Sequence, residues 1–306
     1  MPEPDVSLEG KVALVTGAGA GLGRAEALSL AAAGANLVLN DLAAGDHRTI
    51  VDEIEAAGGK AVFVEGDVAE RSTADAMMQA GIEQFGGVHV VVNNAGFTRD
   101  RMLFNMTDDE WDAVIRVHLR GHFLLTRNAA AYWREQFKST GAPVYARLVN
   151  TSSEAGLSGS EGQPNYAAAK SGISAFTVSA ARSLGRLGVR ANAICPRART
   201  AMTAGVFGEA PNDAGLDPLS VEHVAPFVTF LASPAADAIN GQVFVVHGGM
   251  VALMAPPSVE KRFDTTRSSG PTWTPEECAG TVGEYFADRD PDRTFACTEV
   301  LSLNPS

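Results

Sequence analysis

The chain has 306 residues, 45% hydrophobic and 20% charged, which is the composition of an ordinary globular protein and excludes a disordered one. Its 36 acidic and 24 basic side chains give a formal net charge of −12. Without a basic cluster, this balance predicts no nucleic acid and no anionic membrane as a partner. Three unpatterned cysteines, an N-terminus without an apolar core and the lack of a long apolar run predict a cytoplasmic protein without a disulfide framework.

Short runs rich in Val, Leu and Ile alternate with segments of helical periodicity. Because such runs are typical of strands buried on both faces, we expect an α/β fold with a Rossmann-like, doubly wound parallel sheet of seven strands. The expected strands cover residues 11–16, 35–41, 61–67, 88–96, 147–153, 190–195 and 241–249.

Helices are expected between these strands, and the longest runs from about Asp108 to Phe137. Residues 8–249 are predicted to form one catalytic domain that binds NAD, and residues 250–306 a C-terminal extension. Within the extension, Thr274, Pro275 and Glu277 fit the first positions of a capped helix.

A glycine-rich turn, "TGAGAGLGRAEAL", follows the first strand and opens a helix. Glycines there let the backbone turn tightly and approach a pyrophosphate, which then lies at the helix N-terminus. The strand–loop–helix context makes this a strong signal for a dinucleotide site. Its candidate residues are Gly17, Gly21, Leu22 and Gly23.

Asp41 ends the second expected strand, 24 residues after Gly17. A carboxylate in this place accepts hydrogen bonds from the adenosine ribose hydroxyls and repels a 2′-phosphate. The sequence therefore predicts NAD rather than NADP, with a plain turn residue as the alternative reading of Asp41.

Two histidines, His118 and His122, stand four residues apart in the long helix, a spacing found in zinc sites. The sequence contains no HExxH pattern, and no third ligand is evident nearby. We therefore expect no metal.

Taken together, the motifs resemble those of the short-chain dehydrogenases/reductases over almost all of residues 8–249. The TGxxxGxG pattern of that family stands here as Thr16 to Gly23, and its NNAG pattern as Asn93 to Gly96. Its serine, tyrosine and lysine match Ser153, Tyr166 and Lys170, although Ser152 is a neighbouring alternative.

The resemblance implies hydride transfer between NAD and a secondary alcohol or ketone. Tyr166 would be the general acid/base, Ser153 would hydrogen-bond the substrate oxygen, and Lys170 would bind the nicotinamide ribose. Since Tyr166 and Lys170 share a helix face, we expect the ammonium to lower the pKa of the phenol. The family pattern adds further cofactor contacts at Asp67, Val68, Asn94, Ala95 and Gly96.

The sequence departs from the family pattern at two places. His118 stands where the family carries an asparagine linked to a helix kink and a proton path. It is either a water-binding proton relay or a core side chain. After the sixth expected strand the chain reads "CPRARTAMT", with Arg197 in the place of a glycine. Pro196 and Thr200 are the expected cofactor contacts in this loop.

At these two places the chain is similar to a narrower branch of the family. This branch comprises the dehydrogenase part of the peroxisomal multifunctional β-oxidation enzyme and its stand-alone actinobacterial relatives. That similarity implies a 3-hydroxyacyl-CoA dehydrogenase, with a steroid side chain as one possible acyl group, or a 17β-hydroxysteroid dehydrogenase. Alternatives are a 3-oxoacyl thioester reductase of lipid synthesis and a non-catalytic NAD-binding sensor.

Arg197 and Arg199 are candidates for binding CoA phosphates, with surface ion pairs as the alternative. The family also implies a homodimer or homotetramer.

Overall fold

The seven strands expected from apolar runs are all present in the computed structural model, which describes residues 4–42, 48–203, 208, 217–265, 272–290 and 293–303. They pair in the parallel order β3-β2-β1-β4-β5-β6-β7, so the chain winds outward in both directions from β1 and β4. Their bounds are β1 Val12–Thr16, β2 Asn36–Asp41, β3 Lys60–Glu65, β4 Val90–Asn93, β5 Ala146–Thr151, β6 Val189–Pro196 and β7 Val243–His247.

An eighth strand, β8 (Met250–Leu253), pairs antiparallel with β7 at the sheet edge. The expected count of seven strands and a wholly parallel sheet was therefore wrong. The cause is a tight hairpin, because Gly248 and Gly249 have φ values of 56° and 80°, which suit a two-residue turn. The first residues of the predicted C-terminal extension thus belong to the sheet.

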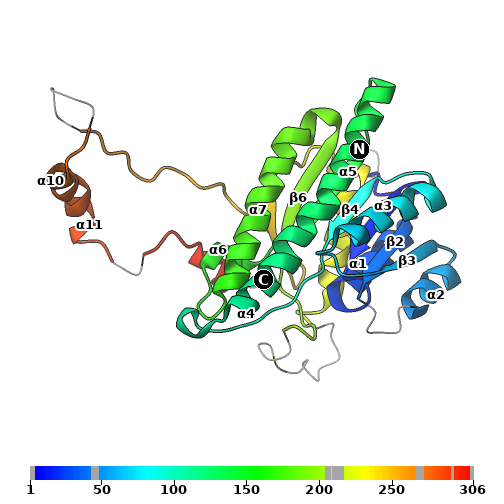
Figure 1. Cartoon of the computed structure of the whole chain (residues 1–306), viewed down its shortest axis with the longest axis horizontal. Helices are drawn as coiled ribbons and strands as arrows, with labels where there is room; N and C mark the ends of the chain where they lie inside the picture. Colours follow the sequence, from blue (N-terminus) through cyan, green and yellow to red (C-terminus); the bar gives the residue numbers. More distant parts are fainter. Residues whose placement is uncertain are drawn as a thin grey trace.

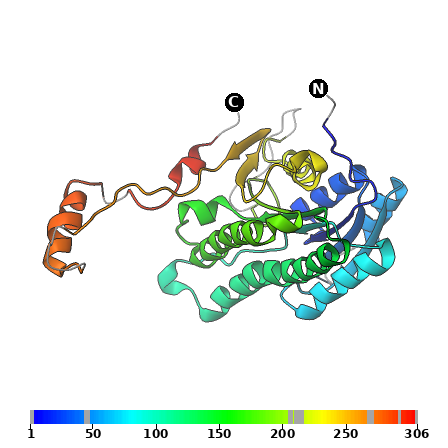
Figure 2. The ribbon, with the colours of Figure 1, turned by 90° about the horizontal axis from the view of Figure 1, so that it is seen from above.

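Helices cover both faces of the sheet (Figures 1 and 2). Side chains from α1, α2 and α9 pack on one face, and side chains from α3, α5 and α7 pack on the other. Alternate residues of β1 supply both cores, with Val15 on the first face and Leu14 on the second. This two-sided burial explains the continuous apolar strands. The helices are α1 Gly21–Ala32, α2 Arg48–Ala56, α3 Arg71–Phe85, α4 Asp108–Ile115, α5 Gly121–Thr140, α6 Glu154–Ser158, α7 Pro164–Leu184 and α9 Ala225–Ala232.

The long helix expected at residues 108–137 is α4 and α5 joined without a break by a π-helical stretch, η2 (Arg116–Arg120). Thr107 caps its start in a reciprocal pair with Glu110. The π-helical turn contains His118 and locally widens the helix, as such turns do at functional sites.

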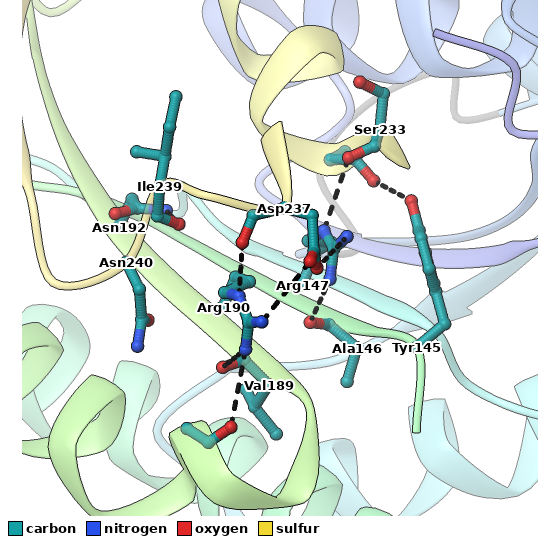
Figure 3. A network of polar contacts seen from close by, with 12 residues as sticks. Tyr145, Ala146, Arg147, Val189, Arg190, Asn192, Ser233, Asp237, Ile239 and Asn240 are labelled. Carbon is teal, nitrogen blue, oxygen red and sulfur yellow. Dashed lines mark hydrogen bonds and ion pairs between the residues drawn. The ribbon is translucent and has the colours of Figure 1, made fainter. Parts of the chain in front are cut away.

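A polar network ties the amino ends of β5 and β6 to the segment after α9 (Figure 3). Arg147 of β5 is buried, bonds the carbonyl oxygens of Ala146 and Ser233, and pairs with Asp237 at 3.2 Å. Arg190 of β6 pairs with the same carboxylate at 3.4 Å. The network lies at the opposite end of the strands from the residues described below.

After β8 the chain runs outward as an arm and then returns (Figures 1 and 2). The arm carries α10 (Pro275–Cys278), η6 (Ala279–Gly283) and α11 (Glu284–Ala287). The expected helix start is confirmed, because Thr274 and Glu277 form a capping box with Pro275 in the first turn. The returning chain ends in η7 (Thr298–Ser302), which packs on α6. A search of the described residues finds no helix with the length and apolarity to cross a membrane.

Candidate active site

A cavity of about 580 Å³ lies at the carboxyl ends of the central strands. In open parallel sheets this is where ligands bind, since the strand order reverses there. Of the residues predicted to bind the cofactor, only Gly23 does not line the cavity. Those that do are Gly17, Gly21, Leu22, Asp41, Asp67, Val68, Asn94, Ala95, Gly96, Tyr166, Lys170, Pro196 and Thr200.

The glycine loop packs directly against the NNAG segment. Gly17 has a φ of 66°, and a β-carbon there would lie 2.8 Å from the α-carbon of Ala95. A β-carbon on Gly23 would lie 2.2 Å from the carbonyl oxygen of Gly17, so Gly23 acts through close packing rather than by facing the cavity. The Thr16 hydroxyl accepts the backbone N–H groups of Asn94 and Ala95 and holds the two segments together.

Asp41 is held at the cavity by backbone donors. Its carboxylate accepts the N–H of Gly19 at 2.9 Å and of Leu42 at 2.8 Å. Among the described lining residues the only arginine or lysine side chains are Arg116 and Lys170, and Arg116 is paired with Asp67 and Glu70. A glycine cradle at a helix start with a fixed carboxylate beyond it fits a dinucleotide.

Tyr166 and Lys170 lie one turn apart on α7, whose first turn contains Pro164. The Lys170 Nζ donates to the carbonyl oxygen of Thr151 at 2.6 Å and lies 5.3 Å from the centre of the Tyr166 ring. Both side chains face the cavity that the glycine loop also lines. The arrangement therefore brings a phenol and an ammonium group to the end of a dinucleotide-sized cavity.

Burial dominates the charge states of this pair. It raises the pKa of Tyr166 to about 12, while a hydrogen bond with Ser153 acts in the opposite direction. It lowers the pKa of Lys170 to about 7. The pKa of Tyr166 is therefore shifted in the direction opposite to the expected lowering by Lys170. Desolvation disfavours the charged forms of both groups.

The two neighbouring serines differ in their partners. Ser152 is buried and donates to the carbonyl oxygen of Lys170 at 2.9 Å, and its hydroxyl also lies 2.8 Å from that of Ser174. Ser153 caps α6 by accepting the N–H of Ala155 at 3.2 Å and hydrogen-bonds Tyr166. Ser152 therefore anchors α7, and Ser153 keeps its hydroxyl next to the phenol.

His118 is fully buried beside Tyr166, with its ring edge-on to the phenol and the ring centres 5.2 Å apart. Its Nε2 lies 2.7 Å from the carbonyl oxygen of Phe97 and 3.0 Å from the N–H of the same residue. A β-carbon on Gly96 would come within 2.1 Å of this ring. The π-helical turn thus inserts the imidazole between the NNAG segment and Tyr166.

Both histidines are neutral at physiological pH. Burial and, secondarily, the charge of Lys170 lower the pKa of His118 to about 3. Burial, Lys170 and His118 together lower the pKa of His122. Within the described part of the chain, no three His, Cys, Asp or Glu side chains are grouped as a metal site would require.

Arg197 and Arg199 are both engaged in ion pairs. Arg197 forms a two-nitrogen contact with Glu154 at 2.7 and 3.1 Å and donates to the carbonyl oxygens of Val300 and Leu303. Arg199 pairs with Asp217 at 2.8 Å. Of the two readings of these arginines, the structure favours ion pairing over phosphate binding.

Several lining residues were missed by sequence reasoning. They have no motif of their own, and the only signal was their position near a motif residue. They include Asn40, Leu42, Gly66, Phe97, Thr151, Ala198 and Met202.

Comparison with known proteins gives one family model, "short chain dehydrogenase", which matches residues 11–209. The chain is 61% identical over 302 residues to the "Hydroxyacyl-CoA dehydrogenase ChsB1" of Mycobacterium tuberculosis, covering 96% of this chain and 94% of that protein. It is 41% identical to a "3-oxoacyl-[acyl-carrier-protein] reductase" of Synechocystis, over 80% of this chain and 98% of the reductase.

Over 80% of its length the chain is also 38% identical to the mouse "Peroxisomal multifunctional enzyme type 2", of which the match covers 33%. The solved structure of a short chain dehydrogenase from Mycobacterium avium superposes with a TM-score of 0.82 at 42% identity, over 93% of this chain and 97% of the other. The similarity to the narrower branch expected from the sequence is confirmed.

Proposed function

The chain belongs to the short chain dehydrogenase family, and we propose that it is an NAD-dependent 3-hydroxyacyl-CoA dehydrogenase. The family makes it an oxidoreductase that uses NAD or NADP. The observation that carries the finer proposal is the cavity in which the glycine loop, Asp41, Tyr166 and Lys170 meet. The 61% identity to a protein named a hydroxyacyl-CoA dehydrogenase supports the substrate class.

We infer that Tyr166 is the general acid/base. In the oxidative direction it removes the hydroxyl proton of the substrate, while Ser153 donates a hydrogen bond to the same oxygen. When bound, the oxidised dinucleotide supplies the acceptor for the hydride that leaves the carbinol carbon. Lys170 donates toward the ribose, and the hydrogen bond from Ser153 opposes the desolvation that disfavours tyrosinate.

NAD is preferred over NADP in this proposal because of Asp41. Its carboxylate is fixed by two backbone donors at the cavity, where a 2′-phosphate would meet a like charge. The adenine would lie beside Asp67 and Val68, which line the same end of the cavity.

A CoA ester needs cations outside the catalytic pocket, because the carrier has several phosphate charges. Arg199 and Arg197 are paired, as described above. Arg99 lies two residues beyond the lining residue Phe97, with its guanidinium over that ring, and among the described residues it has no carboxylate partner. We infer that Arg99 contacts a CoA phosphate at the cavity mouth.

Two other substrates fit the same catalytic groups. A 17β-hydroxysteroid presents a secondary alcohol without a CoA group, and a 3-oxoacyl thioester would be reduced by the reverse reaction. The identity to a 3-oxoacyl-[acyl-carrier-protein] reductase supports the second alternative. We propose residues 8–249 as the catalytic unit and residues 250–306 as an extension of it, whose first segment adds strand β8 to the sheet.

The test is NADH appearance at 340 nm with a 3-hydroxyacyl-CoA and with a 17β-hydroxysteroid, each with NAD and with NADP. The proposal expects NAD-linked oxidation of the CoA ester that Tyr166→Phe abolishes. Turnover of the free steroid alone would refute the CoA assignment. NAD binding without turnover of any alcohol or of the reverse-direction 3-oxoacyl substrates would indicate a non-catalytic sensor.

A further inference from the structure

The π-helical stretch η2 lies against the segment that follows β3. This segment, residues 67–70, begins with the two residues beside which the adenine is proposed to lie, and we call it the adenine segment. Arg116 of η2 donates to the Asp67 carboxylate at 2.8 Å and also pairs with Glu70. A planar guanidinium can bridge two carboxylates in a fixed direction, whereas an ammonium group acts as a point charge. Arg116 therefore ties together the two ends of the adenine segment.

Two further contacts hold the adenine segment against the long helix. Arg120, at the end of η2, donates to the carbonyl oxygen of Ala69 at 3.1 Å. Gly121 follows, and a β-carbon there would lie 2.9 Å from a methyl group of Val68, so the two segments pack at close range. The backbone N–H of Ala69 donates to the second oxygen of Asp67 at 2.8 Å. Both oxygens of this carboxylate therefore accept a hydrogen bond, and its orientation is fixed.

Arg116 and its partner Asp67 both line the cavity of the candidate active site. The Arg116 side chain is 43% exposed, and ion pairs this exposed contribute little to folding stability. The effect of the pair is therefore expected at the cavity itself. Among the described lining residues the carboxylates are Asp41 and Asp67, and a dinucleotide is itself an anion. Arg116 offsets one of these two charges and fixes the direction of its carboxylate.

The same stretch of helix also contacts the catalytic end of the cavity. His118, between the two arginines, lies 2.7 Å from the carbonyl oxygen of Phe97 and edge-on to Tyr166. A change in η2 could therefore act on the cofactor or on the phenol. The two effects are separable, because a displaced adenine segment weakens cofactor binding, whereas a displaced His118 lowers kcat.

We propose that Arg116 is a positioning residue for the adenosine half of the dinucleotide and that it acts through Asp67. It holds the Asp67 carboxylate and the adenine segment in the arrangement that receives the adenine. This role differs from that of Asp41, which acts on the 2′ position of the ribose. The inference rests on the proposed function, since it requires that the cavity bind a dinucleotide.

Calorimetric titration of the full chain with NAD and with ADP measures binding without turnover. Arg116→Gln should raise the dissociation constants of both ligands at least about fivefold and by a similar factor, because both contain the adenosine half. The kcat at saturating NAD should change by less than about twofold. Arg71→Gln, which breaks an exposed ion pair with Asp75 nearby, is the matched control and should bind both ligands as the wild type does. Unchanged binding in Arg116→Gln would overturn the inference.

A double-mutant cycle tests whether Arg116 acts through Asp67. On the Asp67→Asn background, Arg116→Gln should raise the dissociation constant of ADP by less than about twofold, because the paired carboxylate is already gone. Arg116→Lys retains the charge without the planar fork and should recover only part of the affinity. Independent effects in the cycle, or full recovery by Arg116→Lys, would overturn the positioning role. Failure of the wild type to bind either ligand would overturn the proposed function as well, which distinguishes the two outcomes.

Discussion

At the scale of single residues, the position of Asp41 links a strand end to cofactor choice. The carboxylate lies at the end of β2 and is held by the N–H groups of Gly19 and Leu42. Asp41→Asn retains the acceptor for Leu42 but removes the like-charge repulsion of a 2′-phosphate. We expect the ratio of kcat/KM for NAD over NADP to fall at least about tenfold. Asp67→Asn is the control, and an unchanged ratio in Asp41→Asn would contradict the assignment.

His118 is expected to position Tyr166 without changing its own charge. His118→Ala opens space beside the phenol and removes the bond to Phe97, so kcat should fall by about 10- to 100-fold with a smaller change in KM. His118→Asn can still bond the Phe97 backbone and should recover part of that loss. Because the pKa of His118 is about 3, the pH profile of kcat between 6 and 9 should keep its shape in both variants. A lost ionisation in that range would indicate a charged relay instead.

Glu26 makes stability depend on pH. It is buried in α1, and within the described residues its carboxylate has no hydrogen-bonding partner. Burial raises its pKa from 4.5 to about 8. Between these values the folded state binds a proton that the unfolded state has released, so stability falls as the pH rises, by about 1.4 kcal/mol per pH unit for this group. Glu26→Gln should remove this slope in urea unfolding measured from pH 5 to 8, and an unchanged slope would exclude this role.

At the scale of elements, the network in Figure 3 joins two strands to the segment after α9 through one carboxylate. Asp237 is 65% exposed, which weakens its contribution to stability. Arg147 is buried, however, and without Asp237 it loses the one ionic partner that it has in the described part of the chain. We expect Asp237→Asn to lower the free energy of unfolding by about 1–2 kcal/mol.

The double variant Asp237→Asn with Arg147→Met should lower the free energy of unfolding by less than the sum of the two single variants, because no buried charge remains in it. Thermal unfolding of the two single variants and the double variant measures this coupling. Since the network lies at the amino ends of the strands, kcat/KM should stay constant. Strict additivity of the three values would contradict the coupling.

The parallel strands were predictable because burial on both sheet faces leaves unbroken apolar runs, as in β1 and β4. The cofactor residues were predictable where backbone geometry demands one residue type, as at Gly17 and Gly23. β8 was not, because four residues with alternating exposure give too short a signal. The environment of Lys170 was not predictable either, since its desolvation depends on the packing of α7 against β5 rather than on any local pattern.

At the scale of the whole molecule, Arg197 joins three distant parts of the chain: the loop after β6, the start of α6 and the returning C-terminal segment. Its guanidinium bonds Glu154 and the carbonyl oxygens of Val300 and Leu303, so four of its five N–H donors are engaged within its own chain. Arg197→Ala should therefore release η7, which increases hydrogen–deuterium exchange in residues 298–303 and lowers the free energy of unfolding by about 1–3 kcal/mol.

The same variant separates a structural arginine from one that binds CoA. For each protein, the KM of a 3-hydroxyacyl-CoA is divided by the KM of the same acyl group on a truncated thioester without phosphates. Arg197→Ala should leave this ratio unchanged, because its partners are carboxylate and carbonyl oxygens of the protein itself. Arg99→Ala should raise the ratio about five- to tenfold, since an exposed arginine without a carboxylate partner is the one that a phosphate can reach. If instead Arg197→Ala raises the ratio and Arg99→Ala leaves it unchanged, the C-terminal contact opens to let Arg197 bind the CoA carrier. The extension would then control access to the substrate rather than anchor the chain.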